Sequence, residues 1–172
     1  MNYSEKYRQL LSALKEKDKV RVLFVCLGNI CRSPAADGIF QAKVEEAGLA
    51  DRFDIDSAGT GGYHIGDLPD NRMRIHARRR GYELTHRARK FSPADFDDFD
   101  LIVPMDGSNE QNLRRQARTL EDERKIVPMA SFVDKAMRFD YIPDPYYEGA
   151  EGFETVLDLL ENGTDNLLNA LS

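Results

Sequence analysis

Short runs with strand character alternate along the chain with longer segments in which apolar residues recur every three or four positions. The runs that favour buried strands are VRVLFV (20–25), RFDIDSAGT (52–60), LIVPM (101–105) and KIVPM (125–129). Helical patterns separate them, and a long closing helix is predicted over residues 153–171. Because strands that alternate with helices pair in parallel through right-handed crossovers, we predict an α/β fold. It is a small, doubly wound, four-stranded parallel sheet with helices on both faces.

Capping residues predict where several helices begin and end. Ser33 is a good N-cap and Pro34 a good first helical residue, so a helix is predicted to begin there and to end at Gly48. Asp70 and Asp106 are the predicted N-caps of two later helices. No repeat or linker interrupts these elements, which indicates one domain.

Residues 1–19 are predicted to form a helical extension that precedes a single domain over residues 20–172. One stripe of this amphipathic helix carries its apolar side chains, which are Tyr3, Tyr7, Leu10, Leu11 and Leu14. The helix packs either on its own domain or on another chain, and the sequence leaves the oligomeric state open. Its polar face carries charges of both signs and its apolar face has no Trp or Phe, which argues against a membrane anchor.

Composition restricts the class of protein further. Of 172 residues, 41% are hydrophobic and 31% charged, which indicates a globular chain with one continuous core. A formal net charge of −6 argues against a nucleic-acid-binding protein, because neutralising phosphates needs a basic surface. No apolar stretch approaches the roughly 20 residues that span a bilayer, and the first residues lack a secretion signal. We therefore expect a cytoplasmic protein without membrane insertion.

The two cysteines lie together in one segment, VCLGNICRSP (25–34). In a reducing compartment such a pair is more typical of catalytic or redox chemistry than of a disulfide scaffold. The segment connects a predicted strand to a helix, at the sheet edge where doubly wound folds bind ligands. Backbone N–H groups and the helix dipole make such a loop an anion site, and Gly28 and Asn29 permit the backbone conformations that would curl it around a phosphate.

Cys26 and Arg32 supply the chemistry that this anion site would need. The loop N–H groups, the helix N-terminus and the Arg32 guanidinium all favour the thiolate of Cys26, which is the nucleophilic form. The planar Arg32 side chain can bind two phosphoryl oxygens at once. An isolated cysteine and arginine would more often be structural. Their placement on either side of this loop favours catalysis instead.

The segment VLFVCLGNICRSP resembles the active-site signature of the low-molecular-weight protein tyrosine phosphatases. The resemblance covers the chain from about Val20 to its end, because further family motifs follow in the family's order: DSAGT (56–60), PDNR (69–72), FDLIVPMDGSN (99–109) and DPYYEG (144–149). It implies that tyrosine-phosphorylated proteins are hydrolysed through a phosphocysteine intermediate, without a metal or cofactor.

The resemblance also assigns roles to individual residues. It implies that Cys26 is the nucleophile, Arg32 the phosphate-binding side chain and Asp144 the general acid. The remaining residues of the phosphate-binding loop are then Leu27, Gly28, Asn29, Ile30, Cys31 and Ser33. Asn29, Ser33, Ser57 and His86 match the polar residues that hold this loop in shape.

The segment IPDPYYEG (142–149) suits a proton donor on chemical grounds. An aryl phosphate does not readily release a bare phenolate, so a carboxylic acid must protonate the leaving oxygen, and its carboxylate can later activate water. Asp144 stands between two prolines that restrict its backbone. Tyr146 and Tyr147 are candidates for one wall of a slot for a phenyl ring, and Tyr63 in a Gly-rich loop is a candidate for another.

Several alternatives remain open. Metal-assisted hydrolysis is disfavoured, because His64, His76 and His86 lie in no ligand motif. A thiol-dependent arsenate reductase has a similar anion-binding loop, but its thiol relay needs more cysteines than the two in this chain. Protein-arginine phosphatases tend to carry threonine where this loop has Ile30, so an aryl substrate is favoured. A catalytically inactive module that only binds phosphotyrosine would not need Cys26, Arg32 and Asp144 together.

The second cysteine suggests redox regulation. One thiolate suffices for phosphoryl transfer, so Cys31 is either a small buried packing residue or a resolving thiol. A thiolate at Cys26 is prone to oxidation to sulfenic acid, which a neighbouring thiol can capture as a reversible disulfide. We favour a Cys26–Cys31 disulfide, and the family resemblance points the same way.

Overall fold

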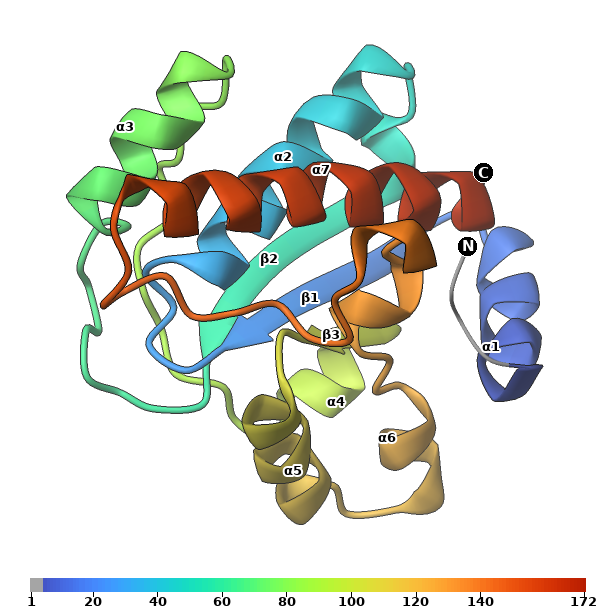
Figure 1. The fold of residues 1–172 in the computed structure, drawn as a ribbon. Helices are drawn as coiled ribbons and strands as arrows, with labels where there is room; N and C mark the ends of the chain where they lie inside the picture. Colours follow the sequence, from blue (N-terminus) through green and yellow to red (C-terminus); the bar gives the residue numbers. More distant parts are fainter. Residues whose placement is uncertain (1–4) are drawn as a thin grey trace.

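A parallel sheet of three strands forms the centre of the computed structural model, which describes residues 5–172 (Figure 1). β1 (Val20–Cys26) lies between β2 (Phe53–Gly59) and β3 (Leu101–Pro104), and both neighbours run parallel to it. Cys26, the last residue of β1, pairs in register with Gly59 of β2. The carboxyl end of the central strand therefore carries the first of the two cysteines.

The predicted fourth strand at 125–129 is not a strand. Only an isolated parallel bridge joins Ile126 to Ile102, with two backbone hydrogen bonds of 2.9 and 3.0 Å between this segment and Ile102. Pro128 has no N–H to extend the ladder, and the chain turns at once into the 3₁₀ helix η2 (Met129–Phe132). The sheet of the described chain is thus three-stranded, and the prediction of four strands was wrong.

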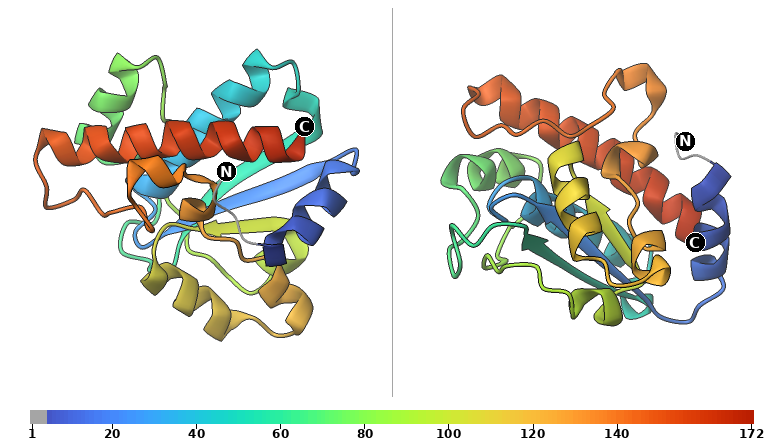
Figure 2. Two further views of the ribbon diagram at one scale, coloured as in Figure 1. Left: turned by 45° about the vertical axis from the view of Figure 1, so that its right-hand side comes forward. Right: turned by 90° about the horizontal axis from the view of Figure 1, so that it is seen from below.

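Helices cover both faces of the sheet, as predicted (Figure 2). The helices other than η2 are α1 (Glu5–Lys15), α2 (Arg32–Glu46), η1 (Ala50–Arg52), α3 (Asn71–Arg79), α4 (Asp95–Asp98), α5 (Gly107–Gln116), α6 (Leu120–Arg124), η3 (Lys135–Met137) and α7 (Ala150–Leu171).

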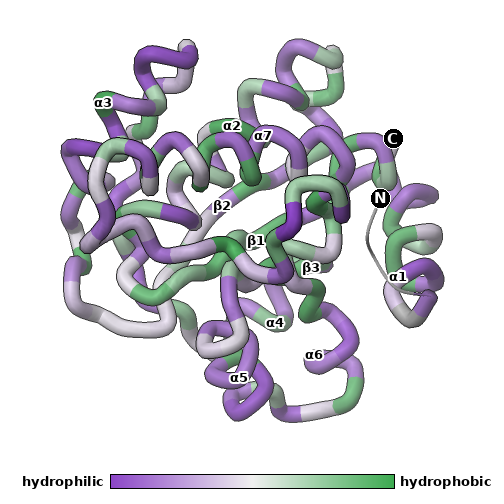
Figure 3. The backbone as a smooth tube through the Cα atoms, viewed as in Figure 1, coloured by the Kyte–Doolittle hydropathy of each residue, from purple (hydrophilic) through white to green (hydrophobic). Residues whose placement is uncertain are grey.

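Each face of the sheet has its own buried core. On one face Phe24 of β1 packs with Phe40 of α2 and with the apolar side of α7. On the other face Leu23 of β1 packs with Phe96 of α4 and Leu113 of α5. Alternate side chains of β1 therefore enter opposite cores, and Figure 3 shows hydrophobic positions gathered along β1 and β3. β1 is therefore a central strand that is covered on both faces.

The predicted helix boundaries were partly correct. Asp70 and Asp106 cap α3 and α5, as predicted, and Gly48 adopts the positive φ of 72° that ends a helix. The predicted cap at Ser33 was wrong. α2 already begins at Arg32, with Cys31 as an N-cap residue that makes no side-chain capping bond. Ser33 lies inside the first turn, where its hydroxyl contacts Cys26 instead.

α1 packs on the same chain, against α7. Its Leu11 and Leu14 are buried, whereas Tyr3 of the predicted stripe lies outside the described residues. Arg52 donates hydrogen bonds to backbone carbonyls at the C-terminal ends of both α1 and α7. No helix within residues 5–172 is long and apolar enough to cross a bilayer.

Candidate active site

The loop between β1 and α2 lies at the carboxyl edge of the sheet and packs closely on β2. A Cβ atom at Gly59 would stand 2.7 Å from the Leu27 carbonyl oxygen and 3.1 Å from the Asn29 nitrogen, so this close approach requires glycine. Asn29 adopts a left-handed backbone with φ of 58°, as its residue type permits. Gly28 does not have a positive φ. A Cβ atom there would lie 3.1 Å from the His64 ring, so packing is the clearer reason for this glycine.

The buried side chain of Asn29 connects the loop to its surroundings. Its Nδ2 donates to the hydroxyls of Ser33 at 2.7 Å and Ser57 at 3.0 Å. Its Oδ1 accepts from His86 Nε2 at 2.9 Å and from the backbone N–H of Arg89 at 3.0 Å. The four polar residues that the family resemblance associates with the loop, Asn29, Ser33, Ser57 and His86, are therefore brought together in one network.

Cys26 lies at the bottom of the loop, almost fully buried. Its Sγ is 3.0 Å from the hydroxyl oxygen of Ser33. That oxygen accepts from Asn29, and the single Ser33 hydroxyl hydrogen has two acceptors in reach, the sulfur at 3.0 Å and the Ala58 carbonyl at 3.4 Å. The N-terminus of α2 follows within six residues. The sulfur of Cys26 thus lies between a hydroxyl group and the first turn of a helix.

Arg32 is only 2% exposed, and Asp106 holds it in place. Arg32 Nη1 donates to Asp106 Oδ2 at 2.6 Å and to the Ile142 carbonyl at 3.0 Å. Burial acts to lower the pKa of Arg32, yet the nearby Cys26, Asp106 and Asp144 raise it above its ordinary value. The guanidinium therefore stays charged inside the protein.

Asp106 is a site residue whose second role sequence reasoning missed. Its Oδ1 accepts from the Asn109 N–H at 2.9 Å and caps α5, as predicted, while its Oδ2 binds Arg32. Its place directly after β3, at the same sheet edge as Cys26, was the available signal. One carboxylate thus joins a helix start to the buried guanidinium.

Asp144 lies at the rim of the site, with a side chain that is 44% exposed. Its Oδ2 is 3.7 Å from Arg32 Nη2, and its Oδ1 accepts from the backbone N–H of Tyr146 at 3.0 Å. The carboxyl group therefore faces both the buried cation and solvent.

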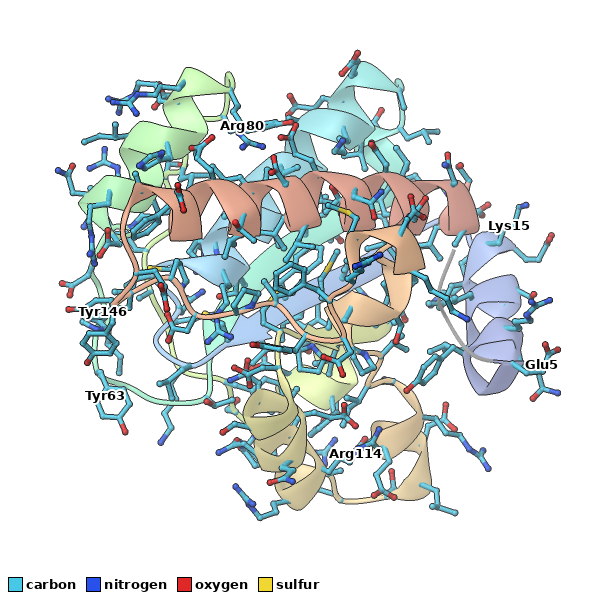
Figure 4. The ribbon with its side chains drawn as sticks, in the orientation of Figure 1. Glu5, Lys15, Tyr63, Arg80, Arg114 and Tyr146 are labelled. Atoms are coloured by element: carbon cyan, nitrogen blue, oxygen red, sulfur yellow. The ribbon has the colours of Figure 1, made fainter. Side chains whose placement is uncertain are left out.

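A cavity of about 300 Å³ opens above the loop. It is lined by Cys26, Leu27, Gly28, Ile30, Cys31, Arg32, Tyr63, His64, Asp144, Tyr146 and Tyr147. Figure 4 shows the labelled Tyr63 and Tyr146 near each other at one edge of the molecule. His64 is a lining residue that sequence reasoning did not assign to the site.

Arg72 supports the Tyr146 side of this cavity. Its Nη1 donates to the Tyr146 carbonyl at 3.0 Å, and its guanidinium carbon lies 5.1 Å from the centre of the Tyr146 ring. Asp70, the N-cap of α3, accepts from Arg72 Nη2 at 2.9 Å and fixes the arginine in turn. Tyr146 is therefore connected, through Arg72, to the first turn of α3.

Cys31 lines the same cavity but has a different environment. It is 5% exposed, and burial is the main reason why its pKa lies well above the ordinary value, with Asp70, Cys26 and Asp144 acting in the same direction. Both cysteines are free thiols. Cys31 is therefore held as the neutral thiol.

Comparison with known proteins identifies the family. The family model for low molecular weight phosphotyrosine protein phosphatases matches residues 21–172. A low molecular weight protein-tyrosine-phosphatase of Streptomyces coelicolor is 43% identical over 152 residues, which cover 88% of this chain and 93% of the relative.

Solved structures agree with this match. A protein tyrosine phosphatase from Entamoeba histolytica, with Hepes in its active site, superimposes with a TM-score of 0.86 at 38% identity, covering 89% of this chain and 97% of that one. A Drosophila arginine phosphatase superimposes with a TM-score of 0.79 at 34% identity, covering 86% and 95%. The chain belongs to the low molecular weight phosphotyrosine protein phosphatase family.

Proposed function

We propose that this protein hydrolyses phosphotyrosine in proteins through a phosphocysteine intermediate, with Cys26 as nucleophile, Arg32 as phosphate-binding residue and Asp144 as general acid and base. The observation that carries the proposal is the 300 Å³ cavity, which collects a buried thiol, a buried guanidinium and a carboxyl group beneath tyrosine side chains. No metal or cofactor enters the mechanism. A thiol nucleophile must stay reduced, which favours a cytoplasmic location.

In the first step the Cys26 thiolate attacks phosphorus while the bond to the phenolic oxygen breaks. The loop N–H groups and Arg32 bind the phosphoryl oxygens. Asp106 and Ile142 occupy Arg32 Nη1, so the Nη2 and Nε hydrogens are the ones directed to phosphate. Asp144 transfers its proton to the leaving phenolate oxygen, which becomes a neutral phenol.

In the second step water replaces the thiol. The carboxylate of Asp144 takes a proton from a water molecule, the water oxygen attacks phosphorus, and the sulfur–phosphorus bond breaks. The Ser33 hydroxyl, 3.0 Å from Sγ, donates to the departing thiolate. Inorganic phosphate leaves, and Cys26 returns to the state in which it began.

The lining of the cavity favours an aryl phosphate. Ile30 and the tyrosines Tyr63, Tyr146 and Tyr147 present apolar surface and ring faces to a phenyl group, whereas a phosphoguanidine would find no polar side chain at position 30. The likeness to an arginine phosphatase makes phosphoarginine the substrate to compare. Phosphotyrosine hydrolysis, phosphoarginine hydrolysis and arsenate reduction should be measured side by side with EDTA present, and the proposal fails if either competitor is preferred.

Cys26→Ser should abolish turnover and leave binding of vanadate or tungstate largely intact, because a serine hydroxyl stays protonated where a thiol ionises. Steady-state rates and oxyanion binding are measured on one sample. Cys31→Ser is the matched control and should keep most activity. Turnover near the wild-type level in Cys26→Ser would exclude a phosphocysteine.

Asp144→Asn should lower kcat by about 10²–10⁴-fold, the usual contribution of a general acid. The loss should shrink as the leaving phenol becomes more acidic, because such a phenol departs without a proton. Rates are measured across a series of aryl phosphates. A loss that is independent of phenol pKa would show that Asp144 is not the proton donor.

Asp106→Asn should separate the two roles of this residue. Asparagine is as good an N-cap as aspartate, so its one side-chain oxygen should keep the cap of α5. The buried Arg32 loses a charged acceptor, and kcat should fall by about 10- to 100-fold, the usual range for a hydrogen bond between charged groups. Unchanged kcat, or a loss that follows the melting temperature, would contradict a positioning role.

Hydrogen peroxide should inactivate the wild type reversibly. Peroxide oxidises the Cys26 thiolate to sulfenic acid, and the Cys31 thiol then displaces water from it to form a disulfide that dithiothreitol reduces. Cys31→Ser should be inactivated but recover poorly. Equal recovery of both proteins, or a mass spectrum of the inactivated wild type without the loss of two hydrogens, would leave Cys31 as a packing residue.

A further inference from the structure

Arg72, in the first turn of α3, lies between the rim of the candidate active site and α7. Its guanidinium carbon is 5.1 Å from the centre of the Tyr146 ring and 4.9 Å from the centre of the Phe153 ring. α3 packs against α7, and the loop that carries Tyr146 precedes α7 (Figure 1). Arg72 does not line the 300 Å³ cavity, so it can act on the reaction only through its neighbours.

Asp70 connects Arg72 to the phosphate-binding loop. The Asp70 backbone N–H donates to the Ile30 carbonyl at 2.7 Å, which attaches Asp70 to the loop itself. The Asp70 carboxylate accepts from Arg72 Nε at 3.1 Å and from Arg72 Nη2 at 2.9 Å. Such a two-point contact fixes the plane of the guanidinium. The position of the Arg72 side chain is therefore set relative to the phosphate-binding loop.

Arg72 in turn holds the backbone of Tyr146. Its Nη1, the nitrogen that Asp70 does not bind, donates to the Tyr146 carbonyl at 3.0 Å. The backbone N–H of the same tyrosine donates to Asp144 Oδ1 at 3.0 Å. With Oδ1 held in this way, Asp144 Oδ2 faces Arg32 Nη2 at 3.7 Å. A chain of hydrogen bonds thus runs from the phosphate-binding loop, through the Arg72 side chain, to the carboxyl group at the rim of the site.

Phe153 of α7 gives the guanidinium a fixed surface on which to pack. Phe153 is 1% exposed, and its ring stacks on the ring of His76 from α3, with centres 5.6 Å apart and planes 5° apart. His76 Nδ1 lies 2.5 Å from Glu154 Oε2, so the imidazole is held as well. Arg72 is therefore supported from α3 and from α7, and its contact with Tyr146 joins the site to both helices.

We propose that Arg72 is a positioning residue for the general acid: it fixes the backbone of Tyr146, and through the Tyr146 N–H it fixes the direction of the Asp144 carboxyl group. The proposal rests on the proposed role of Asp144. Proton transfer needs the donor oxygen within about 2.6–3.2 Å of the leaving oxygen. The Asp144 side chain is 44% exposed, so without this bond it can turn toward solvent. A displacement of about 1 Å is enough to lower a rate by about 10²-fold.

Arg72→Met tests this role, with Arg79→Met as the matched control. Methionine keeps a long apolar side chain beside the two rings but donates no hydrogen bond. Arg79 lies exposed on the same helix, so its substitution removes the same charge away from the site. For phenyl phosphate, kcat/KM should fall by about 10- to 100-fold in Arg72→Met and stay unchanged in Arg79→Met. An equal loss in both variants would indicate general attraction of the anionic substrate and overturn the proposal.

The loss in Arg72→Met should depend on the leaving group. Rates are measured for aryl phosphates from phenyl to dinitrophenyl, and kcat/KM is compared because it includes the step in which the phenol departs. The loss should disappear for the most acidic phenols, which leave without a proton, and inhibition by inorganic phosphate should not change. A loss of equal size for every phenol, or weaker phosphate inhibition, would indicate damage to the cavity or the loop and contradict a role through Asp144.

The Asp144→Asn background separates this proposal from the proposed function. With no carboxylic acid to position, adding Arg72→Met should lower kcat/KM for phenyl phosphate by less than about twofold, because residues that act through one another are not additive. The full loss in both backgrounds would overturn the positioning role and leave Asp144 as the acid. If Asp144→Asn alone shows no dependence on phenol pKa, the general-acid assignment fails, and the positioning role fails with it.

Arg72→Lys covers the case in which the methionine variant does not fold. Lysine keeps the charge, but its single ammonium group lacks the planar fork that binds both Asp70 oxygens while reaching the Tyr146 carbonyl. The lysine variant should therefore show the same dependence on the leaving group, with a smaller loss. Wild-type kcat/KM for phenyl phosphate in Arg72→Lys would show that a positive charge alone suffices, and would overturn the proposal.

Discussion

The candidate site depends on one buried amide. Asn29 is 1% exposed, and its side chain uses two N–H groups and its oxygen in four hydrogen bonds. A buried amide with unmet partners would be costly, so this complete set of bonds holds the loop in one conformation. The same residue takes the left-handed backbone that turns the loop. Through Ser33, it also sets the contact of the Cys26 sulfur.

The sheet brings the partners of that amide and of Arg32 together from distant parts of the sequence. β1 ends at Cys26, β2 carries Ser57, and β3 is followed directly by Asp106. All three strands run parallel, so their carboxyl ends meet at one edge. A parallel sheet of only three strands suffices, because each of them supplies one component to the same edge.

The sequence predicted those features of fold and site that depend on local patterns. The three strands, the helices on both faces and the caps at Asp70 and Asp106 follow from periodicity and capping preference. The fourth strand was wrong because Pro128 interrupts an otherwise strand-like run. Ser33 was wrongly predicted as a cap because local rules do not register its bond to Cys26. The second partner of Asp106 and the packing of His64 on Gly28 are likewise contacts between distant segments, which one sequence does not display.

The two cysteines lie close together in the sequence but have different neighbours in the structure. They lie five residues apart and line one cavity. Cys26 is the last residue of β1, and its sulfur contacts the Ser33 hydroxyl, with the cation of Arg32 nearby. Cys31 precedes the helix, where burial and the neighbouring carboxylates of Asp70 and Asp144 raise its pKa. Two thiols five residues apart in one short loop thus have different neighbours, because one lies at the end of a strand beside a hydroxyl and a cation and the other at the start of a helix beside carboxylates.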